Sequence, residues 1–271
     1  MEERHDMNES SLRADGITVG YGGAPVLRDL DFTVSRGHFT AVIGPNGCGK
    51  STLVKTLART LRPTAGQVVL DGVPLERHRS KHVARRIGLL PQEPVVPDGI
   101  TVEELVARGR HPYHAPLRQW SEGDDEAIAS ALTATGVEAL AGRRVADLSG
   151  GQRQRAWIAM VLAQQTEFVL LDEPTSFLDL AHQLDVLHLC QEIRAAGRTV
   201  VAVLHDLNQA ARYADRVVLM RDGDVVAEGT AREVVTSAQV EEVFGVRCRL
   251  VEDPESATPL MIPLQDQRAR P

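Results

Sequence analysis

The chain has 271 residues, of which 43% are hydrophobic and 25% charged, and its formal net charge at pH 7 is −7. This length suits one large domain or two small ones with a well-formed core, and the composition is that of an ordinary globular protein. The negative charge argues against a nucleic-acid-binding surface or a polybasic membrane anchor, because both need concentrated positive charge.

The sequence contains no apolar stretch near the roughly 20 residues that a membrane-crossing helix needs. Its polar start lacks the apolar segment of a signal peptide, so we expect a flexible N-terminal tail over residues 1–12. The three cysteines are widely spaced and odd in number, which favours a reduced cytoplasmic protein without disulfides. Any membrane association is therefore expected to come through a partner subunit.

The first half of the chain is predicted to begin with strands, at residues 16–21, 30–34 and 39–43. A glycine-rich loop follows, and leucines at positions 53, 57 and 61 have helical spacing, which predicts a helix over residues 51–61. Two more strands are predicted at residues 67–70 and 87–90. From Thr101 to about residue 146 the pattern is helical, with a capping box formed by Thr101 and Glu104, a loop at 110–116 and an acidic helix start at 121–126.

The second half alternates helices with apolar strands. The predicted elements are a helix at 153–165, a strand at 168–171, a helix at 180–195, a strand at 199–204 and short strands at 216–220 and 224–227. Continuous apolar strands that alternate with helices indicate a parallel sheet covered on both faces. The polar, proline-containing end of the chain, residues 251–271, is expected to be a C-terminal tail.

The strongest motif is GPNGCGKS at residues 44–51, which matches G-x-x-x-x-G-K-[ST] between a predicted strand and a predicted helix. Backbone N–H groups of such a loop converge on phosphate oxygens, and the helix dipole adds to the attraction. Lys50 is expected to bridge the β- and γ-phosphates and Ser51 to ligate Mg²⁺. Cys48 is interpreted as a small loop residue rather than a redox centre. The predicted nucleotide-binding residues are Gly44, Pro45, Asn46, Gly47, Cys48, Gly49, Lys50, Ser51 and Thr52.

A second motif ends the apolar strand 168–171 with two carboxylates, Asp172 and Glu173. This places both acids at the C-terminal edge of the sheet, where α/β proteins bind ligands. Asp172 suits the Mg²⁺ shell, and Glu173 suits a general base that orients or deprotonates the attacking water. In isolation the pair would be an ordinary strand end, but the phosphate-binding loop favours the functional interpretation.

A third motif, LSGGQ at residues 148–152, opens the next predicted helix. A serine and two glycines before a helix form a second anion-binding turn. One phosphate-binding loop does not need a second such turn, which indicates that the turn serves a nucleotide held by another copy of the chain. The residues predicted for this role are Ser149, Gly150, Gly151 and Gln152.

With these motifs, residues 12–230 resemble the ABC ATPase family, since LSGGQ is similar to the family's signature motif. The resemblance implies that Tyr21 stacks on adenine, that Gln92 senses Mg²⁺ and couples to membrane subunits, and that His205 contacts the γ-phosphate. Residues 176–179 (SFLD) resemble the family's D-loop, which makes Asp179 a nucleotide-site residue. Phe177 is a departure, because the family commonly has alanine there.

The same resemblance implies an α/β fold: a P-loop NTPase core with a mostly parallel sheet, an antiparallel β subdomain and a helical subdomain inserted at about residues 93–165. The ABC ATPase domain would span residues 13–250. The implied cofactors are ATP and Mg²⁺. The implied partners are a second ATPase subunit, two transmembrane permease subunits and, indirectly, an extracytoplasmic substrate-binding protein, with no nucleic acid. The chain would act at the cytoplasmic face of the cell membrane.

A narrower resemblance concerns the transported substrate. TVEELVARGRHP at residues 101–112, LDEPTSFLDLAHQ at 171–183 and the segment 248–259 resemble ATPases of bacterial importers for ferric siderophores. Vitamin B12 and haem importers are close relatives and remain alternatives. His111 and His114 lie beside the first segment, where a loop near the membrane-subunit contact is favoured over a pair of metal ligands.

Other nucleotide-binding proteins fit the sequence less well. An ABC ATPase that acts in translation would usually carry two cassettes in one chain, and one that acts in DNA repair or on chromosomes would carry a long coiled coil. A GTPase would carry an Asn-Lys-x-Asp motif that recognises guanine. The sequence has none of these features. An exporter ATPase shares the hydrolytic motifs, but the importer-like segment from Thr101 and the unfused cassette argue against it.

Overall fold

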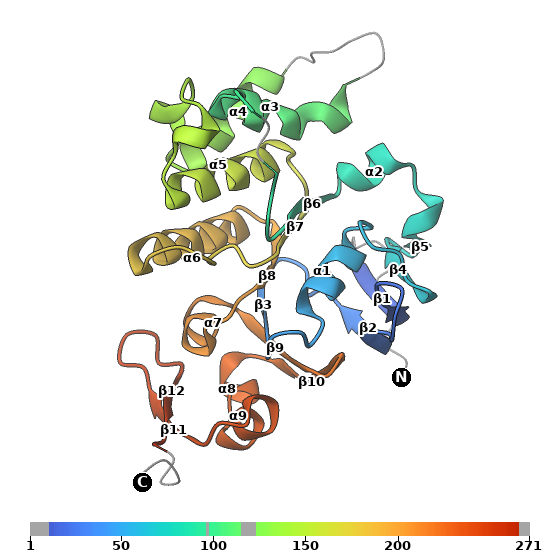
Figure 1. Ribbon diagram of the computed structural model, residues 1–271, viewed down its shortest axis with the longest axis vertical. Helices are drawn as coiled ribbons and strands as arrows, with labels where there is room; N and C mark the ends of the chain where they lie inside the picture. Colours follow the sequence, from blue (N-terminus) through green and yellow to red (C-terminus); the bar gives the residue numbers. More distant parts are fainter. Residues whose placement is uncertain (1–10, 96–97, 115–122, 266–271) are drawn as a thin grey trace, which may run out of the picture.

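The structure is a computed structural model that describes residues 11–95, 98–114 and 123–265. Figure 1 shows a central β-sheet with helices on both faces, a second sheet beside it and a helical layer beyond one end. The helices that form this layer come from one stretch of the chain, residues 102–163, and those that flank the sheet come from before and after it. This arrangement confirms the α/β fold class.

The central sheet has six strands in the order β10-β9-β3-β8-β7-β6. The inner pairs β9–β3, β3–β8, β8–β7 and β7–β6 are parallel, and only β10 joins its neighbour antiparallel. Every residue of β3, β7 and β8 is buried, as expected of strands covered on both faces. The strands are β3 (Phe39–Ile43), β6 (Ile87–Leu90), β7 (Phe168–Leu171), β8 (Thr199–Val203), β9 (Arg216–Arg221) and β10 (Asp224–Gly229).

The second sheet confirms the antiparallel β subdomain. Its order is β2-β1-β4-β5, with β1 (Leu12–Val19), β2 (Leu27–Thr33), β4 (Ala65–Leu70) and β5 (Val73–Pro74). The tail expected over residues 1–12 is wrong at its end, because fully buried Leu12 begins β1 opposite Leu70. The rest of that tail, residues 1–10, lies outside the described residues.

Two apolar clusters cover the opposite faces of the central sheet, and the side chains of β3 alternate between them. Phe39, Ala41 and Ile43 face the cluster under the helical layer, whereas Val42 faces the cluster shared with the second sheet. This alternation follows from the two-residue period of a strand. The loop that follows β3 is therefore held between two packed layers.

Helix α1 (Lys50–Leu57) follows the glycine-rich loop and is shorter than predicted. Arg59 adopts a left-handed φ of 59°, and the N–H groups of Thr60 and Leu61 both donate to the carbonyl of Lys55. Such a left-handed residue ends a helix. The periodic Leu61 misled the prediction because the chain turns back and packs it against the same apolar cluster.

The helical layer consists of α3 (Val102–Ala107), α4 (Asp124–Ala134) and α5 (Gly150–Ala163), which pack on one another. The capping box of Thr101 and Glu104 is confirmed, with hydrogen bonds of 3.2 and 2.9 Å. Arg110 and Asp124 form a buried ion pair of 2.7 Å between the segments. Parts of the predicted loop 110–116 and helix start 121–126, residues 115–122, lie outside the described residues.

The remaining helices lie along the sheet and the C-terminal part of the chain. They are α2 (Ser80–Ala84), α6 (Leu180–Ala195), α7 (Leu207–Tyr213), α8 (Ala231–Val234) and α9 (Ser237–Phe244), with 3-10 turns at Leu75–Arg77, Arg108–Tyr113, Glu138–Leu140 and Val145–Asp147. Among the residues that the structure describes, none of the helices has the length and apolar character to cross a membrane.

The C-terminal tail expected from residue 251 is wrong up to residue 263. Strands β11 (Cys248–Glu252) and β12 (Pro259–Pro263) form an antiparallel hairpin. The side-chain amide of Asn208 on α7 donates to the carbonyl of Met261 at 3.1 Å and accepts its N–H at 2.7 Å. The side chain of Asn208 thus satisfies the backbone N–H and carbonyl of Met261, as an adjacent strand would do. Residues 266–271 of the expected tail lie outside the described residues.

Candidate functional site: a nucleotide pocket

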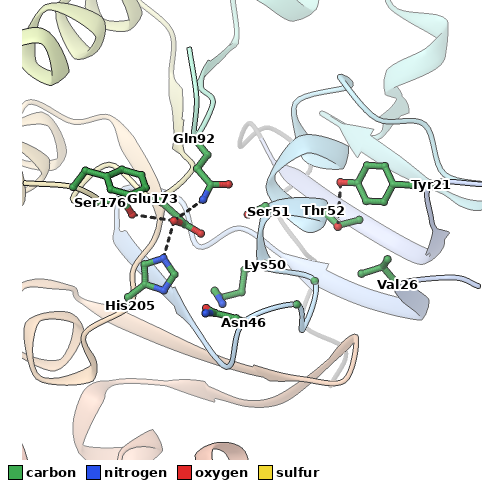
Figure 2. A pocket seen from close by; sticks show the side chains of 13 residues that line it. Tyr21, Val26, Asn46, Lys50, Ser51, Thr52, Gln92, Glu173, Ser176 and His205 are labelled. Atoms are coloured by element: carbon green, nitrogen blue, oxygen red, sulfur yellow. Dashed lines mark hydrogen bonds and ion pairs between the residues drawn. The ribbon is translucent and has the colours of Figure 1, made fainter. Parts of the chain in front are cut away.

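A cavity of about 620 Å³ opens where β3, β7 and β8 end. Because these strands are parallel neighbours, the loops at their carboxyl ends meet at one edge of the sheet. Figure 2 shows Tyr21 and Val26 on one side of the cavity, and Gln92, Glu173, Ser176 and His205 on the other. The lining residues are Tyr21, Val26, Asn46, Gly47, Gly49, Lys50, Ser51, Thr52, Gln92, Glu173, Ser176, Phe177 and His205.

The glycine-rich loop forms the floor of this pocket. Gly49 is the N-cap of α1 with a φ of 105°, and a Cβ atom there would lie 2.5 Å from Leu27 Cδ2, so only glycine fits. Lys50 is 5% exposed, and its ammonium donates to the carbonyls of Gly44 and Pro45 at 2.8 and 2.9 Å. A positive charge and a helix N-terminus thus face the same cavity, which suits a phosphate chain.

Cys48 lies buried in the loop and does not line the cavity. Burial raises the pKa of its thiol, and the nearby Lys50 ammonium offsets this only in part. The thiol is therefore protonated at neutral pH and is a poor nucleophile. This supports its interpretation as a small loop residue.

Asp172, the first residue after β7, carries a buried carboxylate. Neither of its oxygens accepts a hydrogen bond from a described residue, and the closest ammonium, Lys55 Nζ, is 3.9 Å from Oδ2. Burial raises the pKa of Asp172, and the Ser51 hydroxyl and Lys55 oppose this only in part. A buried carboxylate without donors is costly unless a cation accompanies it. Oxygen ligands from Asp172, Ser51 and Gln92 fit a magnesium ion.

Glu173 is the hydrogen-bonding centre of the opposite wall. Its Oε2 accepts bonds from Gln92 Nε2 at 2.8 Å, Ser176 Oγ at 2.9 Å and His205 Nε2 at 2.8 Å, drawn as dashed lines in Figure 2. Burial acts to raise the pKa of Glu173, but the bonds from His205, Ser176 and Gln92 outweigh it, so the pKa is lowered. Glu173 is therefore an ionised acceptor at neutral pH.

The turn after β7 has an unfavourable backbone at two positions. Glu173 and Phe177 have φ values of 55° and 62°, in the left-handed region that side-chain-bearing residues avoid. Such residues concentrate at functional sites, where the surrounding contacts hold them in place. The turn directs the Glu173 carboxylate toward His205 and leaves the Phe177 side chain 92% exposed.

Tyr21 forms the other end of the pocket. The residue is 63% exposed, and its hydroxyl lies 3.4 Å from Thr52 Oγ1. Figure 2 draws this contact as a dashed line. One edge of the ring is thus held while the rest remains open to solvent. An aromatic ring in this position can stack on a nucleobase.

The LSGGQ turn lies elsewhere in the same chain. Ser149 Oγ accepts from the Gln152 N–H at 3.3 Å, and Gln152 Oε1 accepts from the Ser149 N–H at 3.2 Å, a capping box that opens α5. Asp179 is the N-cap of α6. The structure therefore brings Tyr21, residues 46, 47 and 49–52 of the glycine-rich loop, Gln92, Glu173 and His205 together. The predicted residues that do not line this pocket are Gly44, Pro45, Cys48, Asp172, Asp179 and residues 149–152.

The structure adds Val26 and Ser176 to the lining of the predicted site, and it places Lys55 beside Asp172. Val26 lines the pocket beside Tyr21, but a lone valine has no distinguishing sequence signal. Ser176 could have been found from its position, three residues after Glu173, which suits a side-chain bond back across a turn. Lys55, five residues after Lys50, required the three-dimensional course of α1.

The interpretation of His111 and His114 as metal ligands receives no structural support. Their rings are 6.3 Å apart, and His114 Nε2 lies 3.3 Å from Asp124. Across the described part of the chain, no group of three or more His, Cys, Asp and Glu residues is arranged to hold a metal ion.

Known relatives are similar to this chain over nearly its whole length. The sequence profile of the family described as "ABC transporter" matches residues 27–176. The ferric enterobactin transport ATP-binding protein FepC of Escherichia coli (strain K12) is 52% identical over 93% of this chain and 94% of its own. The siderophore transport system ATP-binding protein YusV of Bacillus subtilis (strain 168), whose role is described as probable, is 47% identical over 95% and 94%.

Solved structures agree as well. An ABC transporter assigned to the metal-chelate type, in an inward-facing conformation, superposes with a TM-score of 0.80 and 30% identity, over 94% of this chain and 98% of that one. A bacterial ABC transporter cassette solved as a dimer gives a TM-score of 0.71 and 26% identity, over 81% and 98%. The chain therefore belongs to the ABC transporter family, as an ATP-binding subunit that hydrolyses ATP.

Proposed function

We propose that two copies of this chain bind two MgATP molecules head to tail and energise the import of a ferric siderophore across the cytoplasmic membrane. The observation that carries the proposal is an incomplete pocket. The chain has a second anion-binding turn at residues 149–152, which lies outside its own cavity, with Ser149 and Gly150 exposed. A second copy would supply this turn to the open side of the pocket.

Within each pocket, different residues bind the base, the phosphates and Mg²⁺. Tyr21 stacks on the base, and Lys50 exchanges the carbonyls of Gly44 and Pro45 for β- and γ-phosphate oxygens. Asp172, Ser51 and Gln92 would hold Mg²⁺, which supplies charge neutralisation on the phosphates when bound. The buried carboxylate of Asp172, whose oxygens accept no hydrogen bond from a described residue and whose ammonium neighbour Lys55 is 3.9 Å away, is the feature that fits a cation.

Glu173 and His205 act on the attacking water and the γ-phosphate. The ionised Glu173 carboxylate orients the water and accepts its proton. His205 Nε2, held 2.8 Å from Glu173, donates to the γ-phosphate as charge develops there. Gln92, Ser176 and His205 all bond to Oε2 of Glu173, so Oε1 is the oxygen that receives the water, whereas donation from His205 Nε2 to the γ-phosphate requires its bond to Glu173 to rearrange.

Gln92 also supports a route from the pocket to membrane subunits. It lies two residues after the end of β6, and the chain continues from it toward α3 in the helical layer. A change in the Gln92–Glu173 bond can therefore shift the helical layer relative to the sheet. We place two transmembrane permease subunits against this layer, with the chain held at the cytoplasmic face of the membrane and an extracytoplasmic binding protein delivering substrate.

The names of the relatives support a siderophore as the substrate. Beside the two siderophore proteins above, the achromobactin transport ATP-binding protein CbrD of Dickeya dadantii (strain 3937) is 50% identical. Hemin import ATP-binding proteins of Myxococcus xanthus and Nocardia farcinica are 44% and 43% identical, which makes haem the second candidate.

Growth of a deletion strain tests the substrate. With single ferric siderophores as the iron source, growth should fail on at least one, return with the wild-type gene and not return with Lys50→Ala. Unimpaired growth on every siderophore tested, with loss of growth on hemin, would replace the siderophore by haem. The dimer is tested with Glu173→Gln, which should form an ATP-dependent dimer; hydrolysis at the wild-type rate by this variant would exclude Glu173 as the base.

A further inference from the structure

The imidazole of His182 lies directly against the backbone of Gly151 in the LSGGQ turn. A Cβ atom on residue 151 would lie 2.2 Å from His182 Cδ2, 2.6 Å from Cγ and 2.9 Å from Nε2. Carbon atoms that are not bonded cannot approach so closely. His182 thus occupies the space that any side chain at position 151 would need, and contacts the turn across two elements that are far apart in sequence.

The ring cannot easily turn away from Gly151. Its Nδ1 lies 2.6 Å from Asp179 Oδ1, and the same oxygen accepts the backbone N–H of His182 at 3.0 Å as the N-cap of α6. These bonds lower the pKa of Asp179, which keeps the carboxylate ionised and able to accept both. An alanine at position 151 would have to push the ring off Asp179.

The first turn of α6 is also tied to the hydrolysis side of the pocket. Gln183 Nε2 donates to the carbonyl of Leu178 at 3.0 Å, and Gln209 Nε2 on α7 donates to Gln183 Oε1 at 2.9 Å. Helix α7 begins two residues after His205. Hydrogen bonds therefore connect the start of α6, which carries His182, to the D-loop and to α7, which follows His205.

We infer that His182 is a positioning residue for ATP hydrolysis, which fixes residues 149–152 relative to the D-loop and His205 of the same chain. The inference rests on the proposed function, in which that turn binds the nucleotide of a second copy. Through His182, a displacement at the pocket of one copy displaces the turn that it presents to the other. In this role His182 acts through residues 149–152 and not by contact with a nucleotide.

The test uses the full chain with Glu173→Gln, so that ATP is bound without turnover. The dimer dissociation constant with MgATP is measured by analytical ultracentrifugation for Gly151→Ala, His182→Ala and both together. Each single substitution should weaken the dimer about tenfold or more, the first by overpacking and the second by releasing the turn. The pair should be within about threefold of His182→Ala alone, because the added methyl occupies the vacated space.

Two controls separate positioning from general damage. His188→Ala removes an exposed histidine from the same helix, whose ring packs edge-on against Tyr213, and should leave the constant within about twofold. Thermal unfolding and the affinity of the monomer for a fluorescent ATP analogue should be unchanged by His182→Ala. A merely structural defect would change both, and adding Gly151→Ala would worsen it.

The outcomes distinguish this inference from the function on which it rests. If the Glu173→Gln chain does not dimerise with MgATP, the proposed head-to-tail dimer is wrong, and the inference falls with it. If it dimerises but His182→Ala has no effect, only the inference is overturned. The same holds if Gly151→Ala weakens the dimer equally with and without His182, since the glycine would then be needed for another reason.

Discussion

Replacing Asp172 with asparagine should stabilise the ligand-free chain and remove most of its response to MgATP. The carboxylate is 1% exposed and accepts no hydrogen bond from a described residue, and its distance to Lys55 Nζ is 3.9 Å. An unsatisfied buried polar group costs about 1–3 kcal/mol, and more when charged. Asparagine has the same shape and no charge but leaves its own amide unpaired, so we expect a net gain of about 1 kcal/mol.

With MgATP bound, the wild-type chain should become more stable than Asp172→Asn. At 100 times its dissociation constant, MgATP stabilises the wild-type chain by about 2.7 kcal/mol. If the substitution weakens MgATP binding about 100-fold, as changes around metal sites can, the same concentration stabilises the variant by only about 0.4 kcal/mol. The wild-type chain then becomes the more stable one by about 1 kcal/mol, a shift of about 2–4 °C for a chain of this size.

Scanning calorimetry measures both effects, in EDTA alone and with Mg²⁺ and a non-hydrolysable ATP analogue. Asp224→Asn, an exposed carboxylate at the start of β10 and outside the pocket lining, is the matched control and should follow the wild-type chain in both conditions. If Asp172→Asn were less stable than the wild-type chain in EDTA, the buried charge of Asp172 would not destabilise the ligand-free chain. An undiminished response to the nucleotide would refute the Mg²⁺ assignment instead.

The same experiment has a pH dependence of known sign. The pKa of Asp172 is raised in the folded chain from its ordinary 3.8, so the unfolded chain ionises first as the pH increases. Stability is therefore lost as the pH rises from the unfolded-state to the folded-state pKa, and it is regained in acid. The advantage of Asp172→Asn in EDTA should be full at pH 7 and should shrink as the pH falls through the raised pKa.

Three further predictions concern other parts of the chain. Tyr21→Ala should weaken binding of a fluorescent ATP analogue by about tenfold, the scale of one base-stacking contact, whereas Tyr21→Trp should retain it. Asp124→Ala should lower the free energy of unfolding in urea by about 3–5 kcal/mol, because it leaves the buried Arg110 charge without its 2.7 Å partner. Cys48 should react slowly with iodoacetamide at pH 7, measured by mass spectrometry, because burial raises the pKa of its thiol.

The residues that were predicted from the sequence share a property: each stands in a motif attached to the end of a recognisable element. Lys50 follows β3, Asp172 and Glu173 follow β7, and His205 follows β8 by two residues. Parallel strands bring their carboxyl ends to one edge, so predicting the strands placed the glycine-rich loop beside Asp172 and Glu173, whereas Tyr21, Gln92 and His205 were named from the family resemblance.

The features that were missed depend on contacts between distant residues. The C-terminal hairpin is held by Asn208, which bonds to Met261 across 53 positions of sequence, and nothing in the polar segment itself indicates this partner. The end of α1 depended on the left-handed Arg59, which ordinary helix propensity does not predict. Local sequence patterns were enough to find the motifs of the pocket, whereas the end of α1 and the C-terminal hairpin depend on tertiary contacts.

Gly151 was correctly predicted to belong to the LSGGQ turn, but its contact with His182 was not predicted. From the sequence, Gly151 was only one of two glycines that, with Ser149, open an anion-binding turn. In the structure the missing Cβ would point at His182, whereas Gly150 has only Leu178 Cδ2 and the Phe177 carbonyl nearby, at 3.8 and 3.9 Å. The two glycines therefore have different tasks: Gly150 leaves the outer face of the turn open, and Gly151 lets α6 hold its inner face.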